Sequence, residues 1–257
     1  MSTPDSPASI RDFMRPEYTA PPSRTWSVED IANCITAVYV KLDIFDPEKA
    51  EKAPELIASQ IEQLHEKISA NHKEYPIGMT EPFVVVNFTR LGGLAKLVDN
   101  FREEFHTPVR YDWELDEWDG IVDINRRRLD DGPEPEFGEV RVLDPSPSNR
   151  RKEPGLFVGG RGYSGKTVAK TREYAKNLGT LINAADFIGL QAMRMERGLP
   201  LLGSTSDTTT SFPQMRLGLG GSRGDSEARF IVDSEMRFRL GPDGAYPDVG
   251  VRRSVGL

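Results

Sequence analysis

Proline is unevenly distributed along the 257 residues of this chain, and its positions limit where helices and strands can form. Because proline lacks a backbone N–H and its ring clashes with the preceding helical turn, it is rare inside helices and central strands. Prolines crowd residues 1–26 and 107–154, including Pro4, Pro7, Pro16, Pro21 and Pro22 in the first stretch and Pro133, Pro135, Pro145, Pro147 and Pro154 in the second. Long elements are therefore expected only outside these stretches.

The proline-rich stretches predict how the chain is divided. Residues 1–26 mix proline with Ser and Thr without an apolar period, which predicts a disordered arm. Residues 27–202 are predicted to form a mainly helical core with an irregular acidic insertion over 107–154. Residues 203–257 are polar and Gly-rich, which predicts an extended C-terminal arm. The expected fold class is mainly α with short β elements (α+β).

Three helices are expected before residue 107. Ser27 and Asp30 resemble a capping box, and the helix after them should run to about Leu42. Apolar residues recur at helical spacing in two further runs, Ile57, Ile61, Leu64 and Ile68, and then Leu91, Leu94, Leu97, Val98, Phe101 and Phe105. The single cysteine, Cys34, lies in the first helix without a basic neighbour in sequence, so it is expected to be a small buried apolar side chain.

The clearest helical pattern runs from about Lys166 to Met195. Its apolar stripe consists of Val168, Ala175, Leu178, Ile182, Ala185 and Ala192. Gly179 can divide this run into two helices, and Gly189 on the stripe would allow another helix to approach closely. Short strands are expected where β-branched and aromatic residues cluster, at 83–88, 140–142, 229–233 and 236–240.

The composition argues against several classes of protein. No run of about 18 apolar residues occurs, so no membrane span is expected. The first residues lack the basic and apolar regions of a secretory signal, which favours a cytoplasmic location. One cysteine rules out a disulfide scaffold or a cysteine metal cluster. The histidines are scattered, as His65, His72 and His106, so no metal site is expected, and no catalytic set is recognisable.

The net charge of −7 conceals an uneven distribution of charge. Residues 111–140 hold 3 basic and 11 acidic side chains, a net charge of −8, whereas residues 141–200 hold 11 basic and 5 acidic side chains, a net charge of +6. The two segments can be solvated faces of opposite sign, or they can pair with each other. Alternatively, residues 141–200 face an anion: RNA, a nucleotide phosphate, or the acidic stretch of a neighbouring copy.

The basic segment contains a loop, Gly160–Thr167, that matches the pattern G-x-x-x-x-G-K-[ST]. In such a loop the backbone N–H groups bind phosphate oxygens, the lysine reaches the terminal phosphates and the hydroxyl holds Mg²⁺. The loop resembles the Walker A motif of P-loop NTPases. That resemblance implies ATP or GTP with Mg²⁺ as cofactor, bound by Gly160, Gly165, Lys166 and Thr167, with Asp233 as a second Mg²⁺ ligand.

Other features favour a different use of the same loop. The doubly wound NTPase fold needs several parallel strands, but only one good strand follows Lys166, and no strand is expected within the helical run after the loop. Lys166 and Lys170 lie one helical turn apart, and Arg161, Arg172 and Lys176 add positive charge nearby. Such a cluster also binds a nucleic-acid backbone without any nucleotide chemistry.

A second resemblance lies further along the chain. Ala185-Asp186-Phe187 resembles the Ala-Phe-Asp-Phe core motif of coat proteins from flexible filamentous plant RNA viruses. Those proteins have a helical core between two arms and wind around genomic RNA. The resemblance implies a similar architecture here, with Asp186 in an RNA groove.

The leading hypothesis is a self-assembling, coat- or nucleocapsid-like viral structural protein that binds RNA phosphates non-specifically and is not an enzyme. Its expected partners are further copies of itself and RNA, with no cofactor and no membrane, in the cytoplasm or the virion. The predicted RNA-binding residues are Arg161, Lys166, Lys170, Arg172, Lys176, Asp186 and Arg194. Two alternatives remain open: a small P-loop NTPase or kinase that uses Gly160–Thr167, and a scaffold protein without nucleic-acid contact.

Overall fold

A computed structural model describes much of the chain between Trp26 and Leu257. The described residues are 26–48, 50–71, 79–87, 91–107, 109–111, 121–123, 137–143, 180–202, 209–212, 215–217, 229–232, 236–241, 249–250 and 253–257. The fold class is mainly α with short β elements, as expected. No helix in these ranges is long and apolar enough to span a membrane.

The described residues contain four α-helices and one short 3-10 helix. They are α2 (Val28–Lys41), η1 (Ala50–Lys52), α3 (Ala53–Ala70), α4 (Leu94–Phe105) and α6 (Ala184–Glu196). The capping box predicted at the start of α2 is confirmed, because Ser27 Oγ accepts from the Asp30 N–H at 3.1 Å and Asp30 Oδ2 accepts from the Ser27 N–H at 3.2 Å. Cys34 is buried in this helix, as predicted.

Four strands form an antiparallel sheet, called sheet A. They are β1 (Glu81–Val84), β4 (Val140–Leu143), β11 (Arg253–Gly256) and β5 (Thr180–Leu181), in the order β1-β4-β11-β5. The strands expected near residues 83 and 140 are therefore present and pair with each other. The segment beyond residue 250 contributes an interior strand of this sheet.

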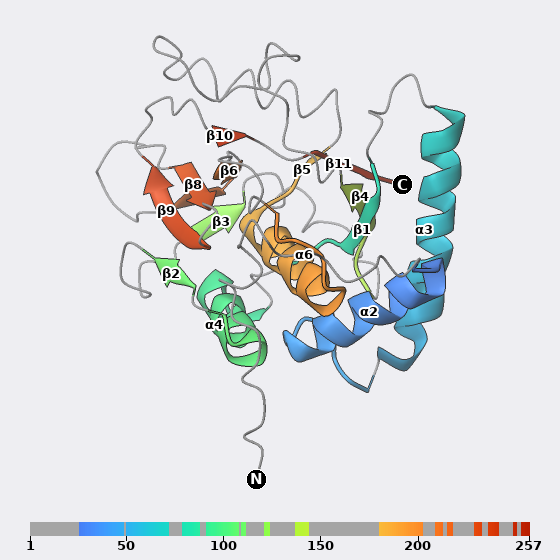
Figure 1. Cartoon of the computed structure of the whole chain (residues 1–257), viewed down its shortest axis with the longest axis horizontal. Helices are drawn as coiled ribbons and strands as arrows, with labels where there is room; N and C mark the ends of the chain where they lie inside the picture. The colour runs from blue at the N-terminus through green and yellow to red at the C-terminus, as the bar shows by residue number, and fades with distance from the viewer. Residues whose placement is uncertain are drawn as a thin grey trace.

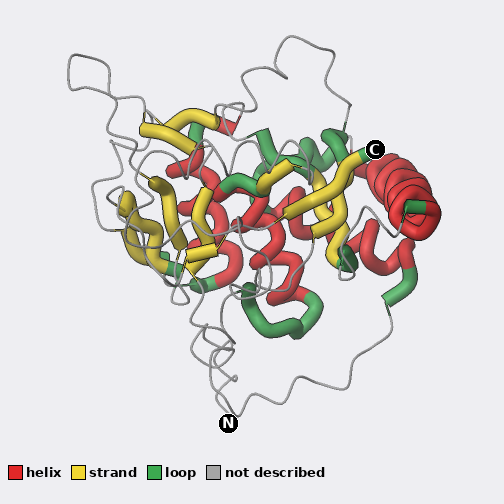
Figure 2. Tube along the Cα trace, turned by 90° about the horizontal axis from the view of Figure 1, so that it is seen from above, coloured by secondary structure: helices red, strands yellow, loops and turns green. Residues whose placement is uncertain are grey.

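Five further strands form sheet B, in the order β10-β6-β8-β9-β2. They are β10 (Val249–Gly250), β6 (Thr209–Phe212), β8 (Arg229–Val232), β9 (Arg237–Gly241) and β2 (Arg110–Tyr111). The outer pairs β10–β6 and β2–β9 are parallel and the inner pairs are antiparallel. A separate antiparallel pair joins β3 (Ile121–Asp123) to β7 (Met215–Leu217). Figures 1 and 2 show sheets A and B on opposite sides of α6, with α3 beyond sheet A.

One expectation needs correction. The helical run predicted from Lys166 to Met195 is wrong around residue 181, where β5 pairs with β11 and a new helix starts at Ala184. The reason is a capping box between Asn183 and Asp186, which starts α6 and leaves Ile182 before the helix. The described residues of segment 203–257 lie mostly in strands, which pair within sheets A and B and with β3, and the rest of the segment lies outside the described residues.

Helix α6 forms the centre of the core. All ten residues from Ala184 to Met193 are buried, which is typical of a helix packed on every side. It contacts α2, α4 and β1. The close approach predicted at Gly189 is confirmed, since a Cβ built on this residue would lie 2.8 Å from Tyr39 Oη on α2.

Three helices meet at their final residues. Lys41, the last residue of α2, forms an ion pair with Glu196, the last residue of α6, and its ammonium lies 5.7 Å from the ring centre of Phe105, the last residue of α4. Helix C-termini carry partial negative charge, so a lysine at this junction is stabilised by the helices as well as by its carboxylate. The junction holds together three elements that are far apart in sequence.

Candidate nucleic-acid interface

The described residues include two of the predicted RNA-binding side chains, Asp186 and Arg194, both on α6. The others, Arg161, Lys166, Lys170, Arg172 and Lys176, lie outside the described residues. The same is true of the residues predicted to bind a nucleotide, Gly160, Gly165, Lys166, Thr167 and Asp233. The structure therefore locates one end of the predicted interface, on α6 and the turn that follows it.

Asp186 lies at the N-terminus of α6 and joins it to β1. Its Oδ2 accepts from the Asn183 N–H at 3.0 Å, and its Oδ1 accepts from the Val86 N–H at 2.9 Å. The carboxylate is buried, and its negative charge is favoured at a helix N-terminus. These contacts give Asp186 a structural role inside the protein, and its predicted contact with RNA stays a prediction.

Arg194 lies in the last turn of α6 and faces β1. Its Nη1 forms an ion pair with Glu81 Oε1, and its Nε donates to the Pro200 carbonyl oxygen. The two paired side chains are each only 12% exposed, so the charge of Arg194 is compensated within the protein. Contact between this side chain and an RNA phosphate would have to compete with Glu81.

Arg197 follows one turn after Arg194, at the C-cap of α6. Its guanidinium lies 5.4 Å from the ring centre of Trp26, which places an aromatic face against the cation. Its Nε is buried and has no hydrogen-bond partner among the described residues. Burial lowers the pKa of this guanidinium, while Glu81 acts in the opposite direction. Arginine nevertheless keeps its charge in proteins, so Arg197 is a partly buried cation.

The described surroundings of Arg197 do not balance its charge. Glu81 is the nearby carboxylate, and it is already paired with Arg194. Burial raises the pKa of the Cys34 thiol to about 11, so at neutral pH this neighbour is uncharged. Glu196 is paired with Lys41. Among the described residues, the end of α6 therefore carries one positive charge without a carboxylate of its own, which an anion such as a phosphate group would neutralise.

Arg197 is not among the residues predicted to bind RNA. A signal was nevertheless present: Arg194 and Arg197 are spaced i, i+3, which places both on one side of a helix end. The partner of Arg194 could not be found in the same way, since Glu81 lies 113 residues away.

A cleft of about 400 Å³ lies elsewhere, along the C-terminal half of α4. It is lined by Asp99, Arg102, Glu103, His106 and Thr107. Arg102 pairs with Asp99 at 3.2 Å, so the cleft offers no excess positive charge for a phosphate. In the described part of the chain no group of three His, Cys, Asp or Glu side chains is placed to hold a metal ion.

Comparison of the chain with models of known protein families, with curated proteins and with solved structures found no match. The arrangement of charges at the end of α6, together with the sequence motifs, therefore carries the functional argument.

Proposed function

We propose that this chain is a self-assembling viral structural protein, coat- or nucleocapsid-like, that binds RNA phosphates without sequence specificity. In this proposal it acts in the cytoplasm of an infected cell and in the virion. Its partners are RNA and further copies of itself. The RNA surface consists of the basic segment 141–200, including Arg161, Lys166, Lys170, Arg172 and Lys176, and extends to the end of α6.

The observation that carries the proposal is the uncompensated charge of Arg197. A buried polar atom without a partner is uncommon in folded proteins, and among the described residues the Nε of Arg197 is such an atom. Arg197 belongs to the segment with net charge +6, so the ligand expected there is an anion. The resemblance at Ala185-Asp186-Phe187 supports RNA as that anion, because this motif opens the helix that ends at Arg197.

The described topology favours this function over the NTPase alternative. A strand does follow the segment after Gly160–Thr167, contrary to expectation, but it is β5, which has only two residues and pairs antiparallel with β11. Sheet A, to which β5 belongs, has antiparallel pairs throughout its described strands, whereas the doubly wound fold needs parallel neighbours. A rise in melting temperature with ATP or GTP and Mg²⁺, abolished by Lys166→Ala, would instead support the NTPase.

The proposal is tested by binding of a fluorescently labelled oligouridylate, measured by anisotropy over a range of salt concentrations. Wild-type protein should bind, with an affinity that decreases as salt increases. Arg197→Gln should make the slope of log K against log salt shallower by about 0.7, the value expected for the loss of one phosphate contact to a single strand. Arg102→Gln is the matched control, because it removes the same charge from an arginine that is 44% exposed on α4.

The possible outcomes separate the parts of the proposal. An unchanged slope in Arg197→Gln, with binding retained, would remove Arg197 from the interface. Absence of RNA binding at low salt, with oligomers in light scattering, would favour the scaffold alternative. Absence of both binding and oligomers would refute the proposed function.

A further inference from the structure

Two arginines at the end of α6 share one carboxylate. Arg194 forms an ion pair with Glu81 of β1, and Arg197 lies one turn further along, where its buried Nε has no partner among the described residues. Of the charged neighbours that act on Arg197, Glu81 has the largest effect, and it raises the pKa of the guanidinium. These three residues, here called the α6-end cluster, have two cations and one carboxylate, a net charge of +1.

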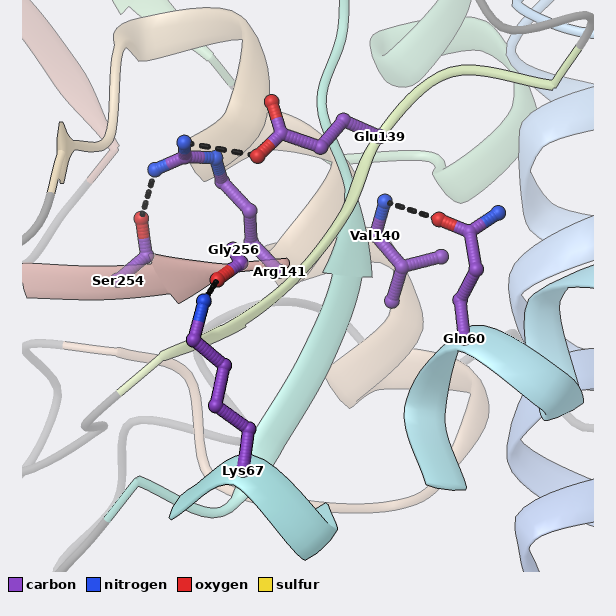
Figure 3. Close-up of polar contacts among 7 residues, drawn as sticks. All are labelled: Gln60, Lys67, Glu139, Val140, Arg141, Ser254 and Gly256. Atoms are coloured by element: carbon purple, nitrogen blue, oxygen red, sulfur yellow. Dashed lines mark hydrogen bonds and ion pairs between the residues drawn. The ribbon is translucent and has the colours of Figure 1, made fainter. Parts of the chain in front are cut away.

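A second partly buried arginine shows a matched arrangement. Arg141 of β4 has a carboxylate of its own, because its Nη2 pairs with Glu139 at 2.9 Å. Its Nη1 donates to Ser254 Oγ at 3.4 Å, so both terminal nitrogens have a partner, as Figure 3 shows. One arginine with one carboxylate is neutral. The α6-end cluster differs because it has two arginines for one carboxylate, which leaves one positive charge for a ligand.

The ionisable neighbours of the cluster leave its net charge unchanged. Burial raises the pKa of the Cys34 thiol to about 11, so this group is uncharged at neutral pH. Lys41 and Glu196 form an ion pair of their own, which is neutral as a whole.

The cluster lies in surroundings where its net charge has a large effect. The side chains of Arg194 and Glu81 are largely buried, and Arg197 is partly buried with its guanidinium 5.4 Å from the ring centre of Trp26. Charges in such a site are screened less than charges at an open surface. An anion at Arg197 therefore experiences Glu81 and Arg194 as well as the nearest cation.

A net charge of +1 discriminates between two classes of phosphate. An internal phosphodiester of RNA carries one negative charge, whereas a phosphomonoester, such as a free nucleotide or a terminal phosphate, carries nearly two at neutral pH. The cost of removing an ion from water rises with the square of its charge, but its attraction to a fixed cation rises only in proportion. A dianion would also leave one negative charge unbalanced beside Glu81. The cluster therefore fits the monoanion better.

We propose that the α6-end cluster selects internal phosphodiesters over phosphomonoesters, and that Glu81 is the residue that sets this preference. Glu81 neutralises one of the two arginines, so that the remaining charge matches one phosphodiester and leaves a dianion unbalanced. This selection rests on the function proposed above. It adds the class of phosphate that Arg197 binds and the residue that disfavours the other class.

The test uses two small probes, dimethyl phosphate as the monoanion and methyl phosphate as the dianion. Each is titrated at pH 7.5 and constant ionic strength. Binding is followed by NMR through the Nε–H signal of Arg197, which is protected from exchange by its burial and is assigned by its absence in Arg197→Lys. Wild-type protein should bind dimethyl phosphate at least as tightly as methyl phosphate.

Two single variants change the net charge of the cluster in opposite directions. Glu81→Gln raises it from +1 to +2 and keeps an oxygen that accepts from Arg194. One unit charge about 10 Å from another changes its affinity by about tenfold at an effective dielectric constant of about 20. The monoanion should therefore bind about tenfold more tightly and the dianion about a hundredfold, which moves the preference about tenfold toward methyl phosphate. Arg194→Gln lowers the net charge to 0 and should weaken both probes, the dianion more.

A double variant separates charge from structure. Glu81→Gln combined with Arg194→Gln restores the net charge of +1 without the ion pair. It should regain the wild-type preference, which a purely structural role of the pair would not produce. Glu139→Gln is the matched control, because it removes a carboxylate from the ion pair with Arg141 and should leave the preference unchanged.

The outcomes distinguish this selection from RNA binding itself. A preference that moves with Glu81→Gln and returns in the double variant supports the role of Glu81. If Glu81→Gln does not fold, Arg194→Gln and the double variant still compare net charges of 0 and +1. A wild-type preference for methyl phosphate, equal preferences in all variants, or no response of Arg197 to either probe would overturn the selection. Salt-dependent binding of oligouridylate would then leave the proposed function standing, whereas its absence would overturn both.

Discussion

Gly189→Ala is expected to destabilise the protein, although alanine is the better helix former. Gly189 lies inside α6, where it faces Tyr39 of α2. An added Cβ would lie 2.8 Å from Tyr39 Oη, 3.2 Å from Cζ and 3.3 Å from Cε1. The tyrosine has little freedom to move, since it is fully buried and donates a hydrogen bond of 2.7 Å to the Val84 carbonyl oxygen.

The expected change in the free energy of unfolding combines one stabilising and two destabilising effects. Helix propensity favours alanine over glycine by about 0.8–1 kcal/mol. Overpacking of a rigid core costs about 1–3 kcal/mol. Displacement of the hydroxyl from Val84 leaves a buried carbonyl without its partner, at a further cost of about 1–3 kcal/mol. The net destabilisation should therefore be about 1–5 kcal/mol, because the steric and polar costs exceed the gain in propensity.

A double-mutant cycle with Tyr39→Phe isolates this mechanism. Free energies of unfolding are measured in urea by circular dichroism for the wild type, both single variants and the double variant. Tyr39→Phe removes the atom nearest to the new methyl group, so Gly189→Ala should cost at least about 1 kcal/mol less in that background. If Gly189→Ala stabilises the wild type, or if the two changes are additive, the close approach of α6 and α2 does not have the energetic role assigned to it.

Two further predictions concern buried ionisable groups. Asp186→Ala should destabilise the protein by about 2–5 kcal/mol, because the Asn183 and Val86 N–H groups lose their acceptor. The control Asp99→Ala, which removes one side of an exposed ion pair, should cost about 1 kcal/mol or less. Equal urea midpoints for the two variants would contradict the role of Asp186. The pKa of Cys34 is raised to about 11, so its contribution to stability is complete below the ordinary thiol pKa and is lost as pH rises toward 11. The free energy of unfolding of the wild type should therefore fall more steeply between about pH 8.5 and 11 than that of Cys34→Ala, and parallel curves would exclude this linkage.

The parts of the fold that were predicted correctly depend on neighbours in sequence. The start of α2 was predictable because Ser27 and Asp30 form a local hydrogen-bonded pair. A close helix contact at Gly189 was predictable because a glycine on an apolar stripe permits close packing. The sequence did not identify Tyr39 as the residue that approaches it. Local hydrogen bonding and helical period are both properties of a short window of sequence.

The features that were missed depend on residues far apart in the chain. Strand β5 consists of Thr180–Leu181, which is too short to show a period, and it exists because β11 pairs with it from more than 70 residues away. The uncompensated charge of Arg197 depends on the pairing of Arg194 with Glu81 across 113 residues. The predicted cluster around Lys166 and the nucleotide-binding residues stay predictions, because they lie outside the described residues.

The contacts along β1 and the residues after it occupy backbone groups that another strand would need. Tyr39 Oη binds the Val84 carbonyl oxygen and Asp186 binds the Val86 N–H, while Pro82 has no N–H to offer. These backbone groups are therefore unavailable to a strand from another molecule, which protects this edge against uncontrolled β-aggregation. In the proposed self-assembly this closed edge would therefore confine contacts between copies to other surfaces of the protein.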